Sequence, residues 1–171
     1  MRIVIINGSG GCGKDSVVKF VKSSNKFYVY NFSTVDPVKL ATDALNIPRE
    51  PKDETIRKFT SDLKDMWTKY YDGPFEYIKS CLQLARISKR NADKVCFVHS
   101  REPKELTRFK DMWPDCIVLL VRRPGYAIKS NHADKNVENF NYDYIIENDS
   151  DMNGLQERTN AFIKEKLIWA S

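Results

Sequence analysis

The sequence has no pair of cysteines with the Cys-x-x-Cys spacing and only two histidines, His99 and His132. These residues offer no ligand set for a structural zinc ion. Three of the four cysteines have apolar neighbours in the sequence, which indicates buried thiols. We therefore expect a reducing, cytoplasmic environment without disulfide bonds. The four are Cys12, Cys81, Cys96 and Cys116.

The sequence also lacks an apolar run of the roughly 20 residues that a membrane-spanning helix requires. The apolar stretch at 3–6 is too short for a signal peptide, and the Asn-Gly-Ser-Gly-Gly that follows is no cleavage site. We interpret this stretch as a buried strand and expect no membrane partner. No internal repeat, low-complexity tract or linker divides the chain, so we predict a single domain over residues 1–171.

The charge of the chain is only mildly biased. Its 28 Lys and Arg residues against 23 Asp and Glu residues give a net charge of +5. This balance suits anionic small substrates and would also suit DNA or RNA. No run of basic residues is long enough to decide between these partners, and the oligomeric state stays open.

Apolar runs alternate with helical patterns along the chain. The continuous Ile and Val content of the first run is typical of a strand buried on both faces, as in a parallel sheet. Five strands separated by helices predict an α/β fold with a doubly wound five-stranded parallel sheet and helices on both faces. In such sheets ligands bind at the carboxyl ends of the strands. The predicted strands are 2–7, 27–33, 95–99, 116–121 and 144–147, and the predicted helices are 14–23, 37–45, 53–71, 75–91, 103–112 and 154–169.

The most specific motif is the stretch from Gly8 to Lys14, which matches the pattern GxxxxGK. It directly follows the first predicted strand and opens a helix, which is the context expected for a phosphate-binding loop. Glycines permit backbone conformations that let the amides wrap a phosphate chain at the helix N-terminus. Lys14 would contact the β- and γ-phosphates. This position argues against an ordinary glycine-rich turn.

The residue after the lysine departs from the usual pattern. Ser or Thr normally stands there as a magnesium ligand, whereas this chain has Asp15 followed by Ser16. Asp15 could meet Mg²⁺ directly or through a water molecule, because this ion prefers oxygen ligands. Alternatively, Asp15 only favours the positive end of the helix. Both readings stay open.

With these motifs the sequence resembles the P-loop nucleoside and nucleotide kinases. Gly-Lys-Asp followed by a small residue is similar to phage deoxynucleoside monophosphate kinases and to phosphomevalonate kinases of P-loop type. The resemblance implies ATP, Mg²⁺, a core sheet, an acceptor-binding helical region at about 36–91 and an arginine-bearing lid at about 122–142. The residues it implies for ATP and Mg²⁺ are Gly8, Gly10, Gly11, Cys12, Gly13, Lys14, Asp15, Ser16, Arg122 and Asn148.

In the kinases that the chain resembles, the acceptor site begins where the second strand ends. This chain has Ser33, Asp36 and Lys39 there. A carboxylate at Asp36 would orient or deprotonate an alcohol acceptor, whereas a phosphate acceptor needs no base because its oxygen is already ionised. Alternatively, Asp36 is the N-cap of the helix 37–45, with Pro37 at the first helical position.

The acceptor region also contains basic and aromatic residues. Arg57 is the best candidate for the anionic group of the acceptor, because arginine binds phosphate through two parallel hydrogen bonds. The other basic residues, Arg49, Lys52 and Lys58, could instead form a solvated helix face. Aromatic rings at helical spacing either stack on a base or belong to the core. They are Phe59, Trp67, Tyr70, Tyr71, Phe75 and Tyr77.

The third strand ends in His99, where many P-loop kinases carry an aspartate that supports magnesium, so the usual Walker B carboxylate is absent. Glu102 is a candidate substitute. Arg101 resembles the arginine of the Asp-x-Arg motif of deoxynucleotide kinases, which faces the acceptor. In the lid, Arg122 and Arg123 are the arginines expected to close on the transferred phosphoryl group.

Two further stretches have weaker assignments. The polar stretch 130–135 lacks the arginine-rich lid pattern, and Lys129 or Lys135 could substitute for a lid arginine. Asn148 follows the last predicted strand, where the loop of the resembling kinases touches adenine. Asn148 and its neighbours are therefore candidates for backbone contacts to the base.

We therefore predict an ATP-dependent phosphotransferase, in first place a (deoxy)nucleoside monophosphate kinase, with Lys14, Asp36, Arg101 and Arg123 as catalytic residues. An alternative is a kinase of an alcohol: a nucleoside, dephospho-coenzyme A, or a hydroxymethylated pyrimidine in DNA. Asp36 and the mild positive charge favour it. An alternative of another class is a nucleotide-binding switch with little catalysis, which the missing Walker B carboxylate favours.

Overall fold

The computed structural model describes residues 1–47, 54–90, 92–125 and 137–168. The chain forms two compact units. One consists of Met1–Asn31 and Ser88–Ser171, and the other of Phe32–Ile87. The range of the second unit overlaps the acceptor region expected at about 36–91.

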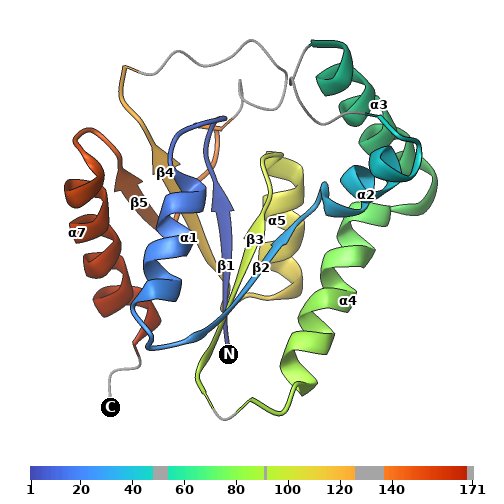
Figure 1. Cartoon of the computed structure of the whole chain (residues 1–171). Helices are drawn as coiled ribbons and strands as arrows, with labels where there is room; N and C mark the ends of the chain where they lie inside the picture. Colours follow the sequence, from blue (N-terminus) through green and yellow to red (C-terminus); the bar gives the residue numbers. More distant parts are fainter. Residues whose placement is uncertain (48–53, 91, 126–136, 169–171) are drawn as a thin grey trace. The chain divides into compact units, whose positions relative to one another are not determined.

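The centre of the fold is a five-stranded parallel sheet with the strand order β2-β3-β1-β4-β5 (Figure 1). Its strands are β1 (Arg2–Asn7), β2 (Tyr28–Ser33), β3 (Lys94–His99), β4 (Ile117–Arg122) and β5 (Tyr144–Glu147). The central strand β1 pairs with β3 on one side and with β4 on the other. Its residues Val4, Ile5 and Ile6 are fully buried, which explains the continuous apolar run at the start of the sequence. The predicted fold class is confirmed.

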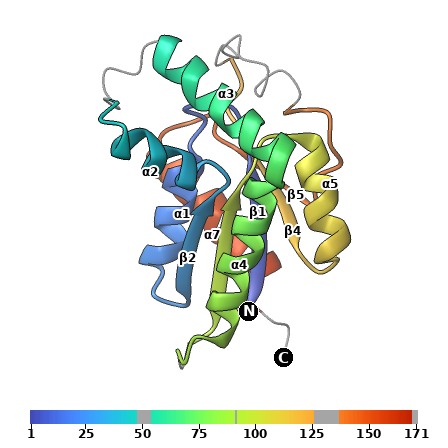
Figure 2. The same ribbon diagram turned by 90° about the vertical axis from the view of Figure 1, so that its right-hand side faces the viewer.

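Helices of the first unit cover both faces of the sheet. Helix α1 (Lys14–Ser23) lies beside α7 (Met152–Phe162) on one face. Helix α5 (Pro103–Met112) lies on the opposite face (Figure 2). Because the connections that leave β1 and β3 pass to opposite faces, the carboxyl ends of these two strands form the switch point of the sheet, where such folds bind ligands.

The core packs apolar side chains of α1 and α7 against the sheet. Val17 and Val21 from α1 meet Leu155 and Phe162 from α7 in the same buried cluster as β1 and β4. The sequence predicted three buried thiols, and three of the four cysteines are buried: Cys12, Cys96 and Cys116, whereas Cys81 is only partly buried.

The last helix begins two residues earlier than predicted. The side chain of Asp151 accepts a hydrogen bond of 2.9 Å from the backbone N–H of Gly154 and so caps α7 at Met152. The helix continues into a π-helical turn, η1 (Ile163–Leu167).

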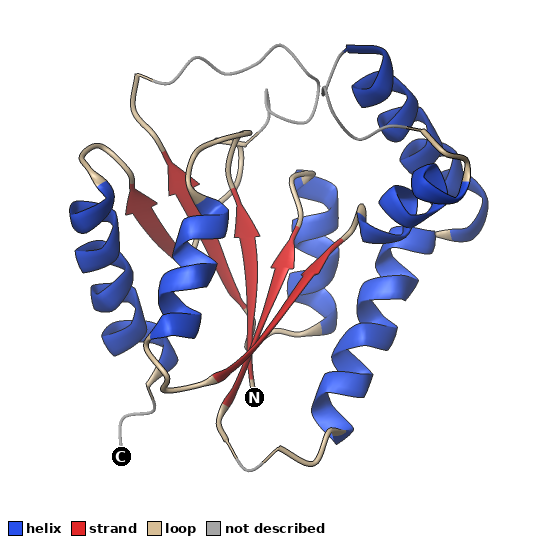
Figure 3. Cartoon of the chain, viewed as in Figure 1, coloured by secondary structure: helices blue, strands red, loops and turns tan. Residues whose placement is uncertain are grey.

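The described residues of the second unit form the helices α2 (Asp36–Ala44), α3 (Glu54–Tyr71) and α4 (Gly73–Ile87), drawn with the other elements in Figure 3. The break between α3 and α4 is shorter than the predicted Asp-Gly-Pro turn. Asp72 alone, with a φ of 52°, separates them. A Cβ atom on Gly73 would lie 1.8 Å from the ring of Trp67, so glycine lets α4 begin directly against this tryptophan.

The interpretation of Asp36 as an N-cap is wrong. The helix begins at Asp36 itself, and Val35 is the N-cap residue. The carboxylate of Asp36 turns back and accepts a hydrogen bond of 2.7 Å from the backbone N–H of Ser33. Among the described helices, none is both long and apolar enough to cross a membrane.

Candidate active site

The loop between β1 and α1 depends on the backbone freedom of glycine. Gly8, Gly11 and Gly13 all have positive φ angles, of 143°, 82° and 109°. A Cβ atom on Gly8 would lie 2.3 Å from the carbonyl oxygen of Val121. A Cβ atom on Gly13 would lie 2.8 Å from the side-chain nitrogen of Asn148. The loop is therefore a closely packed cradle at the carboxyl end of β1, as we expect for a phosphate-binding loop.

The side chain of Lys14 folds back over this cradle. Its ammonium nitrogen donates hydrogen bonds to the carbonyl oxygens of Gly8, at 2.5 Å, and Ser9, at 2.7 Å. It also lies 3.6 Å from the thiol sulfur of Cys12. The ammonium charge therefore adds to the positive end of the α1 dipole at the same place.

The first turn of α1 carries the predicted metal ligands. Asp15 is exposed and Ser16 is half-buried. Within the described ranges, no group of three or more His, Cys, Asp and Glu side chains could hold a metal ion. Mg²⁺ usually keeps several waters and takes one or two protein ligands together with substrate phosphates. The carboxylate of Asp15 and the hydroxyl of Ser16 are oxygen ligands, and two such ligands fit Mg²⁺ that is bound together with a nucleotide.

Asn148 supports the loop with its side chain. Its amide nitrogen donates a hydrogen bond of 2.9 Å to the backbone carbonyl of Cys12. Its backbone N–H donates a second one, of 2.7 Å, to the carbonyl of Arg122. The sequence suggested a backbone contact to adenine at this position and gave no sign of the side-chain contact to the loop.

At the end of β3, a buried serine stands next to β1. The backbone N–H of Ser100 donates to the carbonyl of Ile6 at 3.3 Å, and its hydroxyl donates to a carboxylate oxygen of Glu105 at 2.5 Å. The ring of His99 shares a hydrogen bond of 2.9 Å with Asn31. The carboxylate that reaches back to this strand end is therefore that of Glu105. The sequence suggested Glu102 as the substitute carboxylate at this strand end, but Glu102 is the N-cap residue of α5.

A sequence signal for Glu105 was present. The residue is the third of α5, after Pro103 and Lys104. Acidic side chains at this position of a helix commonly reach back over its N-terminus. Arg101 is half-buried between β3 and α5, within the same connection.

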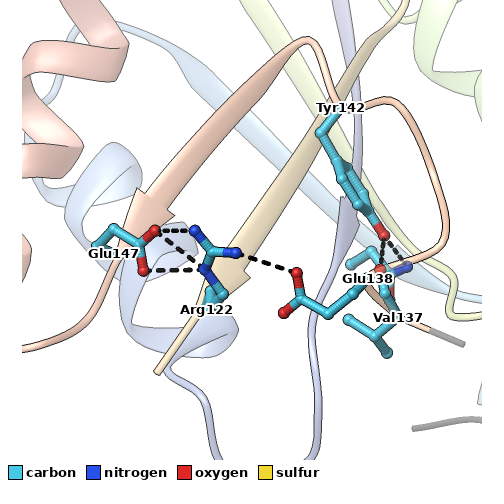
Figure 4. Close-up of polar contacts among 6 residues, drawn as sticks. Arg122, Val137, Glu138, Tyr142 and Glu147 are labelled. Carbon is cyan, nitrogen blue, oxygen red and sulfur yellow. Dashed lines mark hydrogen bonds and ion pairs between the residues drawn. The ribbon is translucent and has the colours of Figure 1, made fainter. Parts of the chain in front are cut away.

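Arg122, at the end of β4, is bound by two carboxylates (Figure 4). Its Nε atom lies 3.0 and 3.2 Å from the two carboxylate oxygens of Glu147, and its Nη2 atom contacts the same group. Its Nη1 atom lies 3.1 Å from Glu138. The hydrogen bonds to Glu147 raise the pKa of Arg122 further above its usual value, and Glu138 adds to this. A nucleotide phosphate would have to compete with both carboxylates for this guanidinium.

Arg123 differs from its neighbour. It is exposed, immediately after the strand and before Pro124. Of the lid expected at about 122–142, the described residues cover 122–125 and 137–142. The alternatives Lys129 and Lys135 and the polar stretch 130–135 lie outside the described residues, as do Arg49 and Lys52.

In the second unit, the predicted acceptor residues Ser33, Asp36 and Lys39 come together. Besides the bond from Ser33, the carboxylate of Asp36 forms an ion pair of 3.3 Å with Lys39. Arg57 is exposed on α3. Lys58 forms an ion pair of 2.7 Å with Asp62 on the solvated face of the same helix. This agrees with the alternative prediction that Lys58 belongs to a solvated helix face.

The sequence could not tell which aromatic residues line a pocket. In the second unit, α2 and α3 enclose a groove of about 420 Å³. Phe75 is instead buried. Burial raises the pKa of the Tyr77 hydroxyl to about 12, with further contributions from Cys81 and Asp36. The residues that line the groove are Pro37, Val38, Ala41, Leu63, Met66, Trp67, Tyr70 and Tyr71.

Comparisons of sequence find no relative. No protein-family model matches the chain, and no curated protein matches it.

Comparison of structure does find proteins of similar fold. A sugar kinase from Janibacter sp. HTCC2649 shares 13% identity over 96% of this chain and 95% of its own, with a TM-score of 0.55. Shikimate kinase from Bacteroides thetaiotaomicron shares 12% identity over 98% of this chain and 99% of its own, with a TM-score of 0.53. At these identities the likeness shows the fold, which this chain shares with both kinases over nearly its whole length.

Proposed function

We propose that the chain is an ATP-dependent phosphotransferase of P-loop type, which transfers the γ-phosphoryl group of ATP to a (deoxy)nucleoside monophosphate. The observation that carries the proposal is the loop from Gly8 to Lys14, with its glycines of positive φ and its ammonium group at the start of α1. Such a loop binds the phosphates of a nucleoside triphosphate. The kinase names of the structural neighbours agree with this proposal.

In this proposal Lys14 exchanges its bonds to the loop carbonyls for bonds to the β- and γ-phosphates of ATP. Asp15 and Ser16 would hold Mg²⁺, which would neutralise phosphate charge. Lys14 then stabilises the charge on the transferred phosphoryl group. Arg101 and Arg123, which follow β3 and β4, are further cations that would stabilise this negative charge.

The helical unit supports a nucleotide as the acceptor. Its apolar groove offers the rings of Trp67, Tyr70 and Tyr71, on which a planar base can stack. Lys39 and Arg57 are cations for the phosphate of the acceptor. A monophosphate needs no general base, because its attacking oxygen is already ionised. Asp36 would then orient Lys39 through their ion pair.

A second candidate is a kinase of an alcohol: a nucleoside, dephospho-coenzyme A or a hydroxymethylated pyrimidine in DNA. The names of the structural neighbours refer to a sugar and to shikimate, which are both polyhydroxylated compounds. In this case the carboxylate of Asp36 would orient the hydroxyl group or take its proton. A third candidate is a nucleotide-binding switch with little catalysis. It is favoured by His99 at the end of β3, which stands where many P-loop kinases carry the Walker B carboxylate.

The experiment that tests these candidates is transfer of labelled γ-phosphate from ATP with Mg²⁺ to a panel of acceptors. The panel holds ribo- and deoxynucleoside monophosphates, nucleosides, dephospho-coenzyme A, and DNA with and without hydroxymethylated pyrimidines. We expect a monophosphate to be labelled. Labelling of an alcohol alone would move the assignment to the second candidate. If DNA is the acceptor, its binding must weaken steeply with salt.

A further inference from the structure

A buried side chain joins the phosphate loop to a distant part of the chain. Asn7 ends β1 and is fully buried. Its amide oxygen accepts a hydrogen bond of 2.7 Å from the backbone N–H of Gly8, the first residue of the loop. Its amide nitrogen donates one of 2.7 Å to the hydroxyl oxygen of Tyr142. Asn7 therefore holds the first peptide group of the loop with one end and Tyr142 with the other.

Tyr142 is itself bound to the backbone of the segment 137–142. Its hydroxyl group donates a hydrogen bond of 2.5 Å to the backbone carbonyl of Val137 (Figure 4). Burial raises the pKa of this hydroxyl to about 12, so it keeps its proton and remains a donor at neutral pH. The ring lies 5.4 Å from that of Phe140, which folds the segment 137–142 on itself.

The other end of this segment is also fixed. Glu138 follows Val137 directly and forms an ion pair of 3.1 Å with Arg122 on β4. The segment is thus attached to β4 through a charge pair and to β1 through Tyr142. Of these two attachments, only the one through Tyr142 and Asn7 continues to a backbone N–H of the loop from Gly8 to Lys14, namely that of Gly8.

We propose that Tyr142 is a positioning residue for the phosphate loop, which acts through Asn7 on the backbone N–H of Gly8. Without the hydroxyl of Tyr142, the buried amide nitrogen of Asn7 loses its acceptor, and an unsatisfied buried donor is unfavourable. The amide group then gains by rotating toward another acceptor, which releases the N–H of Gly8. Because glycine has access to several backbone conformations and Gly8 holds only one of them, with a φ of 143°, the loop samples other conformations once this bond is lost. This inference rests on the proposed nucleotide site only for its effect on binding.

Tyr142→Phe tests the proposal, because it removes the hydroxyl and keeps the ring. Tyr144→Phe is the matched control: the hydroxyl of Tyr144 interacts with Glu165, and its ring packs on Phe162 in the core. Each variant loses one hydroxyl group, but only the hydroxyl of Tyr142 is connected to the loop, through Asn7. We expect Tyr142→Phe to weaken ATP binding about tenfold, as the loss of one buried hydrogen bond would, and Tyr144→Phe to leave it within twofold.

Hydrogen exchange in the protein without nucleotide gives a readout that a general loss of stability would not produce. We expect Tyr142→Phe to speed exchange at the amides from Gly8 to Lys14 while the amides of β3 stay as protected as in the wild type. Equal exchange of the loop amides in the two Tyr variants would overturn the proposal. If the wild type binds no nucleotide, the proposed function fails, but this exchange measurement still decides the role of Tyr142.

A double substitution shows whether Tyr142 acts through Asn7. In the Asn7→Ala background, we expect Tyr142→Phe to change loop exchange and ATP affinity by less than twofold, because the intermediate group is already gone. Additive effects of the two substitutions would contradict the connection. If Asn7→Ala does not fold, Asn7→Ser replaces it, since serine keeps an acceptor for Gly8 but cannot reach Tyr142.

Discussion

The side-chain nitrogen of Asn148 lies 2.9 Å from the backbone carbonyl oxygen of Cys12, so the residue after β5 is attached to the middle of the loop from Gly8 to Lys14. The same nitrogen lies where a side chain on Gly13 would have to go. The shape of the loop therefore depends on a residue far away in the sequence. The first two predictions concern this relationship.

Asn148→Asp removes the donor and sets a carboxylate against the carbonyl of Cys12. We expect nucleotide binding to weaken by about tenfold or more, because a hydrogen bond is lost and the added negative charge repels phosphate. Isothermal titration with ATP and Mg²⁺ measures the change. Asn160→Asp, at an exposed position of α7, adds the same charge away from the loop and should keep the wild-type affinity. Equal affinities of the two variants would show that the bond to Cys12 is unimportant.

Gly13→Ala strains the loop in two ways, through its φ of 109° and through contact with Asn148. Gly125→Ala is its control, because Gly125 has a φ of 72° and open space where a Cβ atom would go. We expect urea unfolding to show a loss of about 1 kcal/mol for Gly125→Ala and about 3 kcal/mol for Gly13→Ala, from backbone strain alone and strain plus overlap. Only Gly13→Ala should also abolish ATP binding.

Asp36→Asn separates the two candidate acceptors. A monophosphate kinase should lose less than about tenfold in kcat, because only the ion pair with Lys39 is weakened. A kinase of an alcohol should lose about 10²–10⁴-fold, the usual contribution of a general base. Steady-state rates with the acceptor identified in the panel measure this difference. Asp62→Asn, on the exposed face of α3, is the control and should behave as the wild type.

Tyr70→Ala tests the apolar groove as the site of the acceptor base. The side chain is 65% exposed, so its removal should leave the fold intact. We expect the KM of the acceptor to rise about tenfold, as loss of one base–aromatic stack would cause, while the KM of ATP stays constant. Phe59→Ala removes a ring from the same helix outside the groove and serves as the control. A rise in the KM of ATP instead would place the nucleotide base of ATP, and not of the acceptor, in the groove.

The stability of the fold should decline in alkaline solution because of two buried thiols. Burial raises the pKa values of Cys96 and Cys116 to about 11. An acid with a raised pKa in the folded state favours folding below its pKa in the unfolded chain, near 8.5. This stabilisation is lost as the pH rises from there through about 11. Urea unfolding at pH 7.5 and 10.5 should show the loss, and Cys96→Ala should reduce the pH dependence.

The strands and most helix ends could be predicted because their signals are local. The residues from Val4 to Ile6 are apolar because β1 is buried on both faces of the sheet, and the loop of glycines after it follows from the motif alone. The break at Asp72 was also visible, although the sequence suggested a longer one. These features depend on residues that are close together in the chain.

Contacts between distant segments could not be predicted. Arg122 meets Glu147 because the two residues are directly opposite in the register of β4 and β5, and the sequence does not state which strands are neighbours. The bond between Asn148 and Cys12 depends on the same strand order. The sequence left two roles open for Asp36, and the role as a cap was wrong because the backbone N–H of Ser33 was not recognised as a competing donor. The site was thus predictable where one motif defines it and unpredictable where several strand ends meet.

The most direct test of the account is transfer of γ-phosphate from ATP by the wild type, by Lys14→Ala and by Lys19→Ala. Lys14 binds the loop carbonyls, whereas Lys19 is exposed farther along the same helix. We expect the wild type and Lys19→Ala to phosphorylate a deoxynucleoside monophosphate at similar rates, and Lys14→Ala to lose at least about 10²-fold while its unfolding curve is unchanged. Equal transfer by Lys14→Ala, or no transfer by the wild type to any acceptor despite tight ATP binding, would contradict the assignment as a P-loop kinase.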